Sequence, residues 1–435
     1  MHKNLPTRLL GLILLAMLTI ACGGAGDAAD VAPASNWEHT TSTEGNVTTV
    51  NNTAGSKWGG DARLVEELSI GQMEGADEYA FGMISGIWPT EDRVYVSDAR
   101  LDVARAYDLE GNFLFTIGAT GQGPGEYESA AGVIGLPDGR IAVHDGQKLI
   151  IYGHDGEYQE AWGNAENSGF RFMGPGMYAV AGNGDIYLRK MIMPEGGFRG
   201  MGAMKFEMRQ ALPGDLGDGI ETPSFDYEQP THQITMGDNV AMMPVPFAPQ
   251  VQSTMMPDGG FAAGVPADYS FEIRRPDGSV TVVKKYWEPT SVNPGELEMQ
   301  MRGMRIIING SSPEIDWSGV DIPATKPAYS GIIASRDGRV FVQPASEITV
   351  NDECMDPNLT NDDLSGMDCT SGATYGDVFD SDGAFLGTFE IPNGANFGWG
   401  TYIDGNSIWT SLEDEMGTVM VKRYRLVAPR DPADS

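Results

Sequence analysis

Two histidines in the sequence are placed where they could donate or accept a proton. Apart from His2, the sequence has four histidines. His39 lies in a polar segment and His154 in a predicted hairpin turn, so His144 and His232 remain as candidates for acid–base chemistry. His144 precedes Asp145 at the end of a predicted strand. A single His at a strand end is more often structural than catalytic, so the catalytic residues stay unassigned and His144 is the one to test.

Polar side chains at equivalent loop positions of neighbouring segments form a candidate ligand-binding set. Carboxylate, guanidinium, imidazole and phenol groups fix the orientation of polar ligands. Acids in such loops also accept hydrogen bonds from nearby backbone amides, which is a structural role. The candidate ligand-binding residues are Asp98, Arg100, Glu126, Tyr127, His144, Asp145 and Arg189.

The stretch GATGQGPGEYESAAG, residues 118–132, is glycine-rich enough to raise the question of a phosphate-binding loop. A P-loop ends in Lys and Ser or Thr at the start of a helix. Here Gly125 is followed by Glu126 and Tyr127, and the next residues, AAGVIGLPDGRIAV, are typical of a strand and a turn. The glycines therefore predict a corner between strands.

Cys354 and Cys369 lie in the acidic segment DECMDPNLTNDDLSGMDC. In an oxidising compartment a disulfide is the simplest interpretation, whereas two thiols without a nearby His make a poor zinc site. The carboxylates of the segment lack the spacing of an EF-hand loop. We assign no cofactor and no metal ligands, and leave calcium open.

The start of the chain has the features of an export signal. A basic beginning precedes an apolar run from Leu9 to Ile20 that is too short for an ordinary membrane span. It resembles a bacterial lipoprotein signal, which implies a signal peptide over residues 1–21 and lipidation of Cys22. With Gly23 next, the resemblance implies lipid anchoring at the outer membrane of a Gram-negative bacterium, on its periplasmic or outer-surface side.

Composition divides the rest of the chain. Residues 22–60 contain little to bury and are expected to form a disordered tether, 61–428 the folded domain, and 429–435 a disordered tail. The formal net charge of −33 repels nucleic acids and anionic lipids. We expect a monomer with no nucleic-acid partner, membrane contact through the lipid anchor only, and an unidentified extracytoplasmic ligand or protein partner.

Internal repeats indicate the fold. The turn positions Asp92, Asp138 and Gly184 follow one another at equal intervals between short alternating strands. A period of about 40 to 50 residues with such strands is the signature of propeller blades, which have four strands each. After Asp404 only three strands remain, so the missing outer strand must come from ARLVEELSIG, residues 62–71. The sequence predicts an all-β, six-bladed propeller closed by an N-terminal strand.

Turn chemistry places the hairpins of the blades, because Asp-Gly and related pairs tolerate the positive φ of tight turns. Hairpins between first and second strands are predicted at Glu91-Asp92, Asp138-Gly139, Asn183-Gly184, Asp258-Gly259, Asp337-Gly338 and Asp404-Gly405. Those between third and fourth strands are predicted at Glu110-Gly111, Asp155-Gly156, Asp277-Gly278 and Asp382-Gly383, with the third blade unclear.

The pattern RVYVSDARLDVARAYDLEGNFLFTIGATGQGPGEY, residues 93–127, resembles the bacterial six-bladed β-propeller lipoproteins related to NHL repeats. The resemblance is specific over residues 62–163, and later blades depart from it. It implies a propeller fold and a binding role, and it supplies no catalytic residues that could be transferred to this chain.

Loop lengths distinguish the two faces of the predicted propeller. Long insertions follow second or fourth strands, which places all of them on one face and marks that face as the functional one. The insertions are residues 190–204, 213–249, 288–327 and 344–373. Two of them are rich in Met, which suits either an adaptable apolar site, thioether binding of copper(I), or simple gap filling. Residues 293–310 predict a short helix.

Two functions compete at this stage. The first is an outer-membrane-anchored, non-catalytic scaffold that binds a ligand or protein through the insertion-bearing face. The alternative is an enzyme on the same face, either a calcium-assisted lactonase or a lyase that uses His with Glu. The enzyme predicts carboxylates or His144 around the channel mouth, and the scaffold predicts an apolar groove.

Overall fold

The computed structural model describes residues 35–430, except 147, 164–177, 193–204, 237–238, 305–314, 357–358, 360–366, 368 and 399. The chain divides into two compact units, Met1–Ala32 and Pro33–Ser435, and every element below belongs to the second. The predicted signal peptide, Cys22 and the end of the predicted tail lie outside the described residues.

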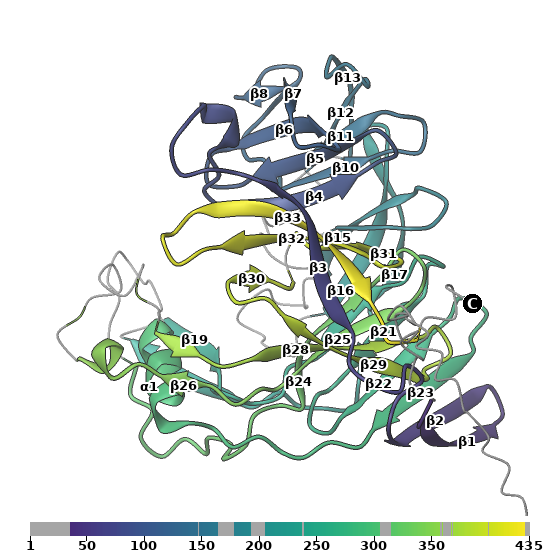
Figure 1. Ribbon diagram of the computed structural model, residues 1–435, viewed down its shortest axis with the longest axis vertical. Helices are drawn as coiled ribbons and strands as arrows, with labels where there is room; N and C mark the ends of the chain where they lie inside the picture. The colour runs from purple at the N-terminus through teal and green to yellow at the C-terminus, as the bar shows by residue number, and fades with distance from the viewer. Residues whose placement is uncertain are drawn as a thin grey trace, which may run out of the picture. The chain divides into compact units, whose positions relative to one another are not determined.

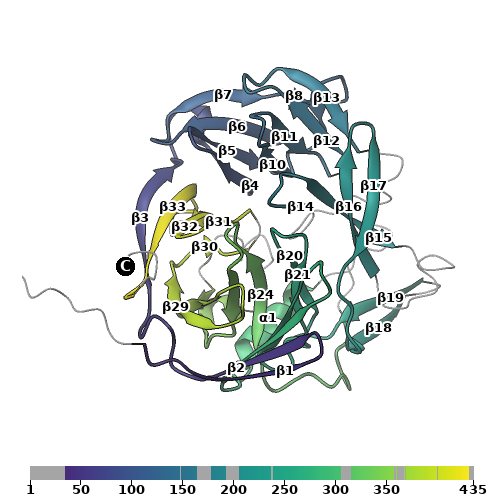
Figure 2. The same ribbon diagram turned by 90° about the vertical axis from the view of Figure 1, so that its right-hand side faces the viewer.

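Six antiparallel blades follow one another around a ring, as Figures 1 and 2 show. In the first three blades the order of the strands in the sheet equals their order in the chain. Blade 1 contains β4 (Ile84–Pro89), β5 (Arg93–Asp98), β6 (Val103–Asp108) and β7 (Phe113–Ile117). Blade 2 contains β10 (Gly132–Gly135), β11 (Ile141–His144), β12 (Leu149–Tyr152) and β13 (Tyr158–Trp162). Blade 3 contains β14 (Tyr178–Val180), β15 (Ile186–Ile192), β16 (Lys205–Leu212) and β17 (Asp215–Glu221).

The last three blades add strands or insertions to this pattern. Blade 4 contains β20 (Gln252–Met255), β21 (Phe261–Gly264), β22 (Ser270–Arg274) and β23 (Val280–Lys285). Blade 5 contains β24 (Tyr329–Ala334), β25 (Val340–Pro344), β28 (Thr374–Phe379) and β29 (Phe385–Ile391). Blade 6 contains β30 (Ala395–Asn396) and β31 (Tyr402–Asp404), which both pair with β32 (Ser407–Glu413), then β33 (Val419–Val427) and β3 (Arg63–Ile70).

The ring closes as predicted, through an N-terminal strand. β3 runs antiparallel to β33, with Arg63 opposite Val427 and Ile70 opposite Val421. In Figure 2 the purple strand β3 lies beside the yellow strand β33. The six-bladed, all-β fold predicted from the repeats is therefore confirmed.

The prediction of a disordered tether is wrong for its described part, residues 35–60. β1 (Glu38–Glu44) and β2 (Val47–Ala54) form a hairpin whose second strand pairs in parallel with β23, so blade 4 becomes a six-stranded sheet. The side chain of Trp58 packs beneath this segment against blade 5 with 1% of its surface exposed. Backbone pairing and one buried Trp hold a segment whose polar composition is otherwise typical of disorder.

Every predicted hairpin between a first and a second strand is present, and so is every one predicted between a third and a fourth strand. Gly139 and Gly259 have φ of 85° and 87°, a left-handed conformation that favours glycine. The hairpin that the sequence left unclear, in blade 3, turns at Pro213-Gly214. The stretch 118–132 turns the corner between blades 1 and 2, where β8 (Ala119–Thr120) pairs with β9 (Glu126–Tyr127).

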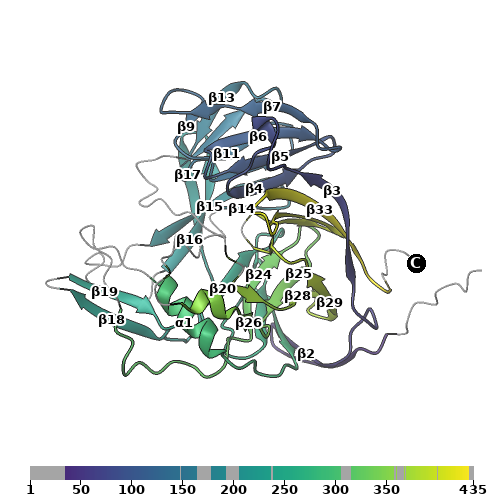
Figure 3. The same ribbon diagram turned by 60° about the vertical axis from the view of Figure 1, so that its left-hand side comes forward.

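The insertions that the structure describes follow second or fourth strands, as predicted, with one change of boundary. Residues 215–221 form β17, so that insertion begins only after blade 3 is complete; it contains the hairpin of β18 (Thr231–Met236) and β19 (Asn239–Pro244). The predicted helix is α1 (Pro294–Gly303), which contacts the short hairpin of β26 (Thr349–Val350) and β27 (Thr370–Ser371). Figures 1 and 3 show α1, β26 and β19 gathered on one side. Two short 3-10 helices, Asp77–Tyr79 and Asp352–Met355, complete the described elements.

Buried apolar side chains gather in six clusters, one at each boundary between neighbouring blades. The boundary between blades 1 and 2 holds a large cluster that includes Tyr95, Tyr127 and Val143. Among the described residues, the boundary between blades 3 and 4 holds the buried side chains of Met208, Met255 and Phe261. In this part of the chain it has the smallest of the six buried clusters.

Candidate ligand-binding cavity

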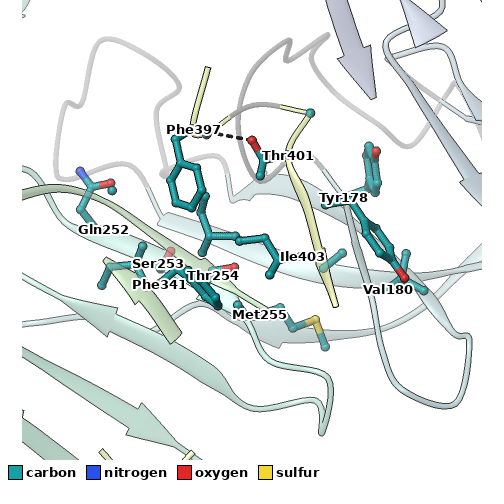
Figure 4. A pocket seen from close by; sticks show the side chains of 18 of the residues that line it. Tyr178, Val180, Gln252, Ser253, Thr254, Met255, Phe341, Phe397, Thr401 and Ile403 are labelled. Carbon is teal, nitrogen blue, oxygen red and sulfur yellow. Dashed lines mark hydrogen bonds between the residues drawn. The ribbon is translucent and has the colours of Figure 1, made fainter. Parts of the chain in front are cut away.

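A cavity of ≈ 380 Å³ lies at the centre of the ring. Its walls come from the first strands of blades 1, 3, 4, 5 and 6, with contributions from β15 and β25. Figure 4 shows Phe341, Phe397 and Ile403 gathered on one side of the cavity, with Tyr178 and Val180 across from them. The volume falls in the range of pockets that hold small organic ligands.

Blade 2 is absent from the lining because two aromatic side chains cover its first strand. A Cβ atom placed on Gly132 would lie 2.4 Å from Cε1 of Tyr178, and one on Gly135 would lie 2.9 Å from Cδ1 of Trp88. The glycines of GVIGLPDG thus let both rings pack flat on β10. The spacing of Gly132 and Gly135 on this inner strand is the signal in the sequence that could have indicated the rings of Tyr178 and Trp88.

One end of the cavity is closed, at the face of the tight Asp-Gly turns. Arg336 donates hydrogen bonds to the carbonyl oxygens of Val180 and Ala181, and its guanidinium lies 5.6 Å from the ring of Trp88. Trp88 meets Tyr402 edge-on at 5.0 Å. The first strands run from the insertion-bearing face toward this end of the cavity.

The opposite end of the lining comes from residues that begin the inner strands, among them Gln252, Ser330 and Phe397. The hydroxyl of Thr401 accepts a hydrogen bond from the backbone N–H of Gly398 at 3.1 Å, and this bond fixes the turn that presents Phe397 (Figure 4). Amide and hydroxyl groups near an aromatic surface can orient a ligand by hydrogen bonding and stacking.

The described lining contains Ser, Thr, Gln, aromatic and aliphatic residues, and two arginines, but no Asp, Glu, His, Cys or Lys. The whole chain has 61 Asp and Glu against 28 Lys and Arg. The cavity thus differs in charge from the rest of the protein, and its described walls offer no carboxylate or imidazole for general acid–base chemistry.

Arg189 on β15 is the one sequence candidate that lines the cavity. Its guanidinium carbon lies 4.0 Å from the centroid of the Phe206 ring, and its Nε atom is buried without a hydrogen-bond partner. Burial lowers the pKa of the guanidinium. No ion pair joins Arg189 to a carboxylate in the described part of the chain.

The loop candidates of blade 1 have structural surroundings. Asp98 is 1% exposed, and its carboxylate accepts hydrogen bonds from the backbone N–H groups of Gly82 and Met83 at 2.6 and 3.1 Å, and from those of Arg100 and Leu101 at 2.9 Å each. The side chain of Arg100 is exposed and lies outside the cavity. This candidate acid therefore orders its own turn.

The candidates in the corner between blades 1 and 2 are likewise structural. The Glu126 carboxylate accepts a hydrogen bond from the N–H of Gly123 at 2.7 Å. The buried hydroxyl of Tyr127 donates to the carbonyl of Ile117 at 2.9 Å and accepts from the N–H of Ala104 at 3.1 Å. These bonds tie the glycine-rich corner to blade 1.

His144 lies behind the wall of the cavity. It is 3% exposed, its ring centroid is 6.0 Å from that of Tyr178, and its Nδ1 has no hydrogen-bond partner. Burial lowers the pKa of His144 to about 4 against the opposing effect of Asp145, so the imidazole is neutral at pH 7. Burial raises the pKa of Tyr178 to about 12. Asp145 itself pairs with Lys148 at 3.4 Å.

His232 is also held structurally. Its Nε2 hydrogen-bonds with the backbone carbonyl of Asp316 at 2.8 Å, and its ring packs 5.2 Å from that of Trp317. The hairpin that carries it, β18–β19, therefore contacts the following insertion rather than the cavity.

A buried polar network lies away from the cavity, between blades 4 and 5. Asp377, 1% exposed, accepts hydrogen bonds from Tyr269 Oη at 2.5 Å, Lys285 Nζ at 2.8 Å and Thr388 Oγ1 at 2.7 Å. Burial, followed by the charge of Asp377, raises the pKa of Tyr269. Since donors on both blades satisfy this one carboxylate, the network joins the two blades.

The predicted disulfide between Cys354 and Cys369 is present. It closes the loop next to β26–β27, where Arg302 of α1 donates to the backbone carbonyl of Cys354 at 3.0 Å. The described residues contain no cluster of three or more His, Cys, Asp or Glu side chains. Within the same ranges, no helix has the length and hydropathy to cross a bilayer.

Several Met residues of the insertions and their flanks fill gaps. Met208, Met255 and Met256 are buried against blade residues. The segment 193–204, which holds other methionines, lies outside the described residues. For the three described side chains, gap filling is the observed role.

The family comparison agrees with the fold. Residues 39–163 match the family model DUF5128, described as a 6-bladed beta-propeller. This match begins inside β1, so it includes the N-terminal hairpin that we had assigned to a tether. No curated protein sequence matches the chain.

Solved structures with a similar arrangement of strands come from several bacteria. A member of the duf4221 family from Bacteroides vulgatus is 9% identical, covers 85% of this chain and 99% of its own, and has a TM-score of 0.43. Virginiamycin B lyase from Staphylococcus aureus is 11% identical over 79% of this chain and 95% of its own, with a TM-score of 0.36. Regucalcin from Agrobacterium tumefaciens, a calcium-binding protein, is 11% identical over 85% and 97%, with a TM-score of 0.37. These likenesses concern the fold alone.

Proposed function

We propose that this chain is a non-catalytic binding protein that takes an organic ligand into the central cavity from the insertion-bearing face. One observation carries the proposal. The cavity is walled by aromatic, hydroxyl and amide groups, and its described lining has no carboxylate, imidazole or thiol. Such walls can bind and orient a ligand, and the Ser, Thr and Tyr hydroxyl groups among them have no carboxylate or imidazole beside them in the described lining to activate a nucleophile.

The cellular setting belongs to the same proposal. The leader that ends at Cys22 favours export and a lipid anchor, and the strongly acidic composition favours a protein that stays free of nucleic acid and lipid headgroups. In this setting the protein presents its cavity to small molecules outside the cytoplasm while the lipid holds it at the outer membrane.

The described residues do not favour the alternative enzyme. A lyase that uses His with Glu needs an imidazole at the reacting atoms, and His144 is separated from the cavity by Tyr178. A calcium-assisted lactonase needs several oxygen ligands around one point, and the described lining supplies no carboxylate.

Blocking the cavity tests the proposal. Ser253 lies on β20 in the lining, so Ser253→Trp should fill part of the cavity, and Ser279→Trp, on an exposed hairpin of the same blade, is the control. The probe is 4-nitrophenyl β-glucoside, followed by calorimetry for binding and by absorbance for nitrophenolate release. We expect binding by the unmodified chain and the control, loss in Ser253→Trp, and no release. Release that Ser253→Trp abolishes would instead establish an enzyme.

A further inference from the structure

The two arginines of the cavity have different environments. Arg336 uses its guanidinium to hold two backbone carbonyls and to pack on Trp88. Arg189 touches the Phe206 ring, while its buried Nε has no acceptor. A guanidinium has five N–H donors, and a buried donor without an acceptor is unfavourable. Of the two arginines of the cavity, Arg189 is therefore the one with a buried N–H donor that has no acceptor in the described structure.

Other half-buried arginines of the protein show what a structural arginine does here. Arg209, on the neighbouring strand β16, donates twice to the carbonyl of Gly217, at 2.9 and 2.7 Å, and lies 3.6 Å from the carboxylate of Glu207. The Nε of Arg423 is also buried without a hydrogen-bond partner, but it lies 3.5 Å from the carboxylate of Glu67. In a chain with more than twice as many acidic as basic residues, carboxylates are abundant partners. The described surroundings of Arg189 nevertheless include none.

The surface around this cavity would not attract anions by its net charge. A formal charge of −33 repels negative ligands at long range, so an anion would bind only where local contacts outweigh that repulsion. The described cavity walls contain no acid that would oppose an anion at short range. Arg189 then provides a planar donor that matches the oxygens of a carboxylate, sulfate or phosphate.

The remaining lining indicates the rest of the ligand. Phe341 and Phe397 lie on the opposite side of the cavity from Tyr178, whose blade also carries Arg189. Ser253 and Thr254 lie in the same lining and present hydroxyl groups. An aromatic or apolar body can occupy the aromatic side while an oxyanion group meets the arginine.

We propose that the cavity is selective for small organic anions, which place a carboxylate, sulfate or phosphate group against Arg189 and an aromatic or apolar body beside the ring of Phe397. This inference rests on the proposed function and adds the ligand class and the residue that selects it. The bond to Arg189 is charge-assisted, so its strength falls with added salt less steeply than that of an exposed ion pair.

Four probes with one common ring test the inference on the full chain. 4-Nitrophenyl sulfate, 4-nitrophenyl phosphate and 4-nitrobenzoate carry the oxyanion, and 4-nitrophenyl β-glucoside is neutral. Calorimetry measures the Kd of each for the unmodified chain, for Arg189→Gln, for Arg189→Lys, and for the control Arg105→Gln. Arg105 is outside the cavity and donates to a backbone carbonyl at 2.9 Å.

We expect at least one oxyanion probe to bind more tightly than the glucoside and to lose about 10- to 100-fold in affinity in Arg189→Gln. Arg189→Lys should recover part of this loss, and Arg105→Gln should bind like the unmodified chain. Glucoside binding should not change in any of these variants, because it does not use the arginine.

Three results would overturn the inference. If the glucoside binds and no oxyanion does, the selectivity is wrong while the proposed function stands. If Arg189→Gln binds the oxyanions as tightly as the unmodified chain, Arg189 is not the selecting residue. If none of the four probes binds, both the inference and the proposed function fail.

Discussion

Neighbouring blades pack against each other through buried side chains. These side chains differ between two boundaries, the one between blades 1 and 2 and the one between blades 3 and 4. At the first, Tyr95, Tyr127 and other fully buried side chains fill the space, and the hydroxyl of Tyr127 is satisfied by two backbone groups. At the second, two methionines and Phe261 are the buried members of the cluster among the described residues. The cavity borders this second boundary, where Met255 and Arg189 both line it.

The comparison shows that a propeller can be closely packed at most of its blade boundaries and less closely packed at one. Uniform filling of all six boundaries would leave little room for a ligand, because protein interiors are close-packed. Met adapts to an irregular space without requiring a single arrangement of neighbours. In the described structure, the boundary between blades 3 and 4 is therefore the less fully packed of the two, and it is the one that borders the cavity.

Replacing one buried side chain at each boundary by Ala should give the largest difference in the free energy of unfolding. Tyr127→Ala removes a fully buried ring and two hydrogen bonds, and we expect a loss of about 3 to 5 kcal/mol in the free energy of unfolding. Met255→Ala should cost about 2 kcal/mol, because the space it leaves joins an existing cavity instead of forming a sealed one. Denaturant titration measures both; equal losses would contradict the difference between the boundaries.

The buried imidazole of His144 should make stability depend on pH. Its pKa is about 4 in the folded chain and close to 6.5 when unfolded, so the unfolded state binds more protons between these values. Stability should therefore fall as the pH falls from 6.5 toward 4. Relative to His144→Leu, the unmodified chain should lose about 2 to 3 kcal/mol between pH 7 and pH 4.5.

The control for this pH dependence is His154→Leu, since His154 has 54% of its side chain exposed. Denaturant titrations at several pH values should give a parallel change in His154→Leu and the unmodified chain. If His144→Leu follows the same pH profile as the unmodified chain, His144 does not titrate as its burial indicates.

The smallest expected effect is a gain in stability, whereas the effects above are losses. Arg189→Met replaces a partly buried cation that has no carboxylate partner in the described structure, so we expect the protein to gain up to about 1 kcal/mol in stability. Arg209→Met, on the adjacent strand, should lose stability because it removes two hydrogen bonds to Gly217. Thermal melting of the two variants checks the signs; a clear loss in Arg189→Met would make that arginine structural.

The ring and its closure could be predicted from the sequence because they depend on local signals. Asp-Gly pairs such as Asp138-Gly139 determine a turn within a few residues, and the count of strands after Asp404 requires a partner for β33. The N-terminal hairpin was missed because β1 faces solvent and both strands contain mostly Thr, Ser and Asn. The pairing of β2 with β23 joins distant segments, which composition does not reveal.

The cavity was predicted only in part. Reasoning from chemistry selected acids and His144 at the strand ends, and the structure places Asp98, Glu126 and His144 in turns or behind the wall. The residues that line the cavity are largely uncharged side chains of inner strands, whose types resemble any propeller core. Arg189 was selected as a loop position equivalent to Asp98 and Asp145, although the structure places it on β15, and its lack of a partner is visible only in three dimensions.

The N-terminal segment has a consequence for how the chain reaches its fold. Asn52 bonds to the carbonyl of Lys284, 232 residues later, and Glu66 pairs with Lys422, 356 residues later. Synthesis makes the first of each pair long before its partner exists, and contacts of such separation slow folding. Until then, β2 and β3 remain unpaired with β23 and β33 and are open to other chains. A shortened N-terminus would instead leave the edges of β23 and β33 unpaired in the finished protein, so its hazards are association with other chains and, where β3 is lost, a ring that does not close.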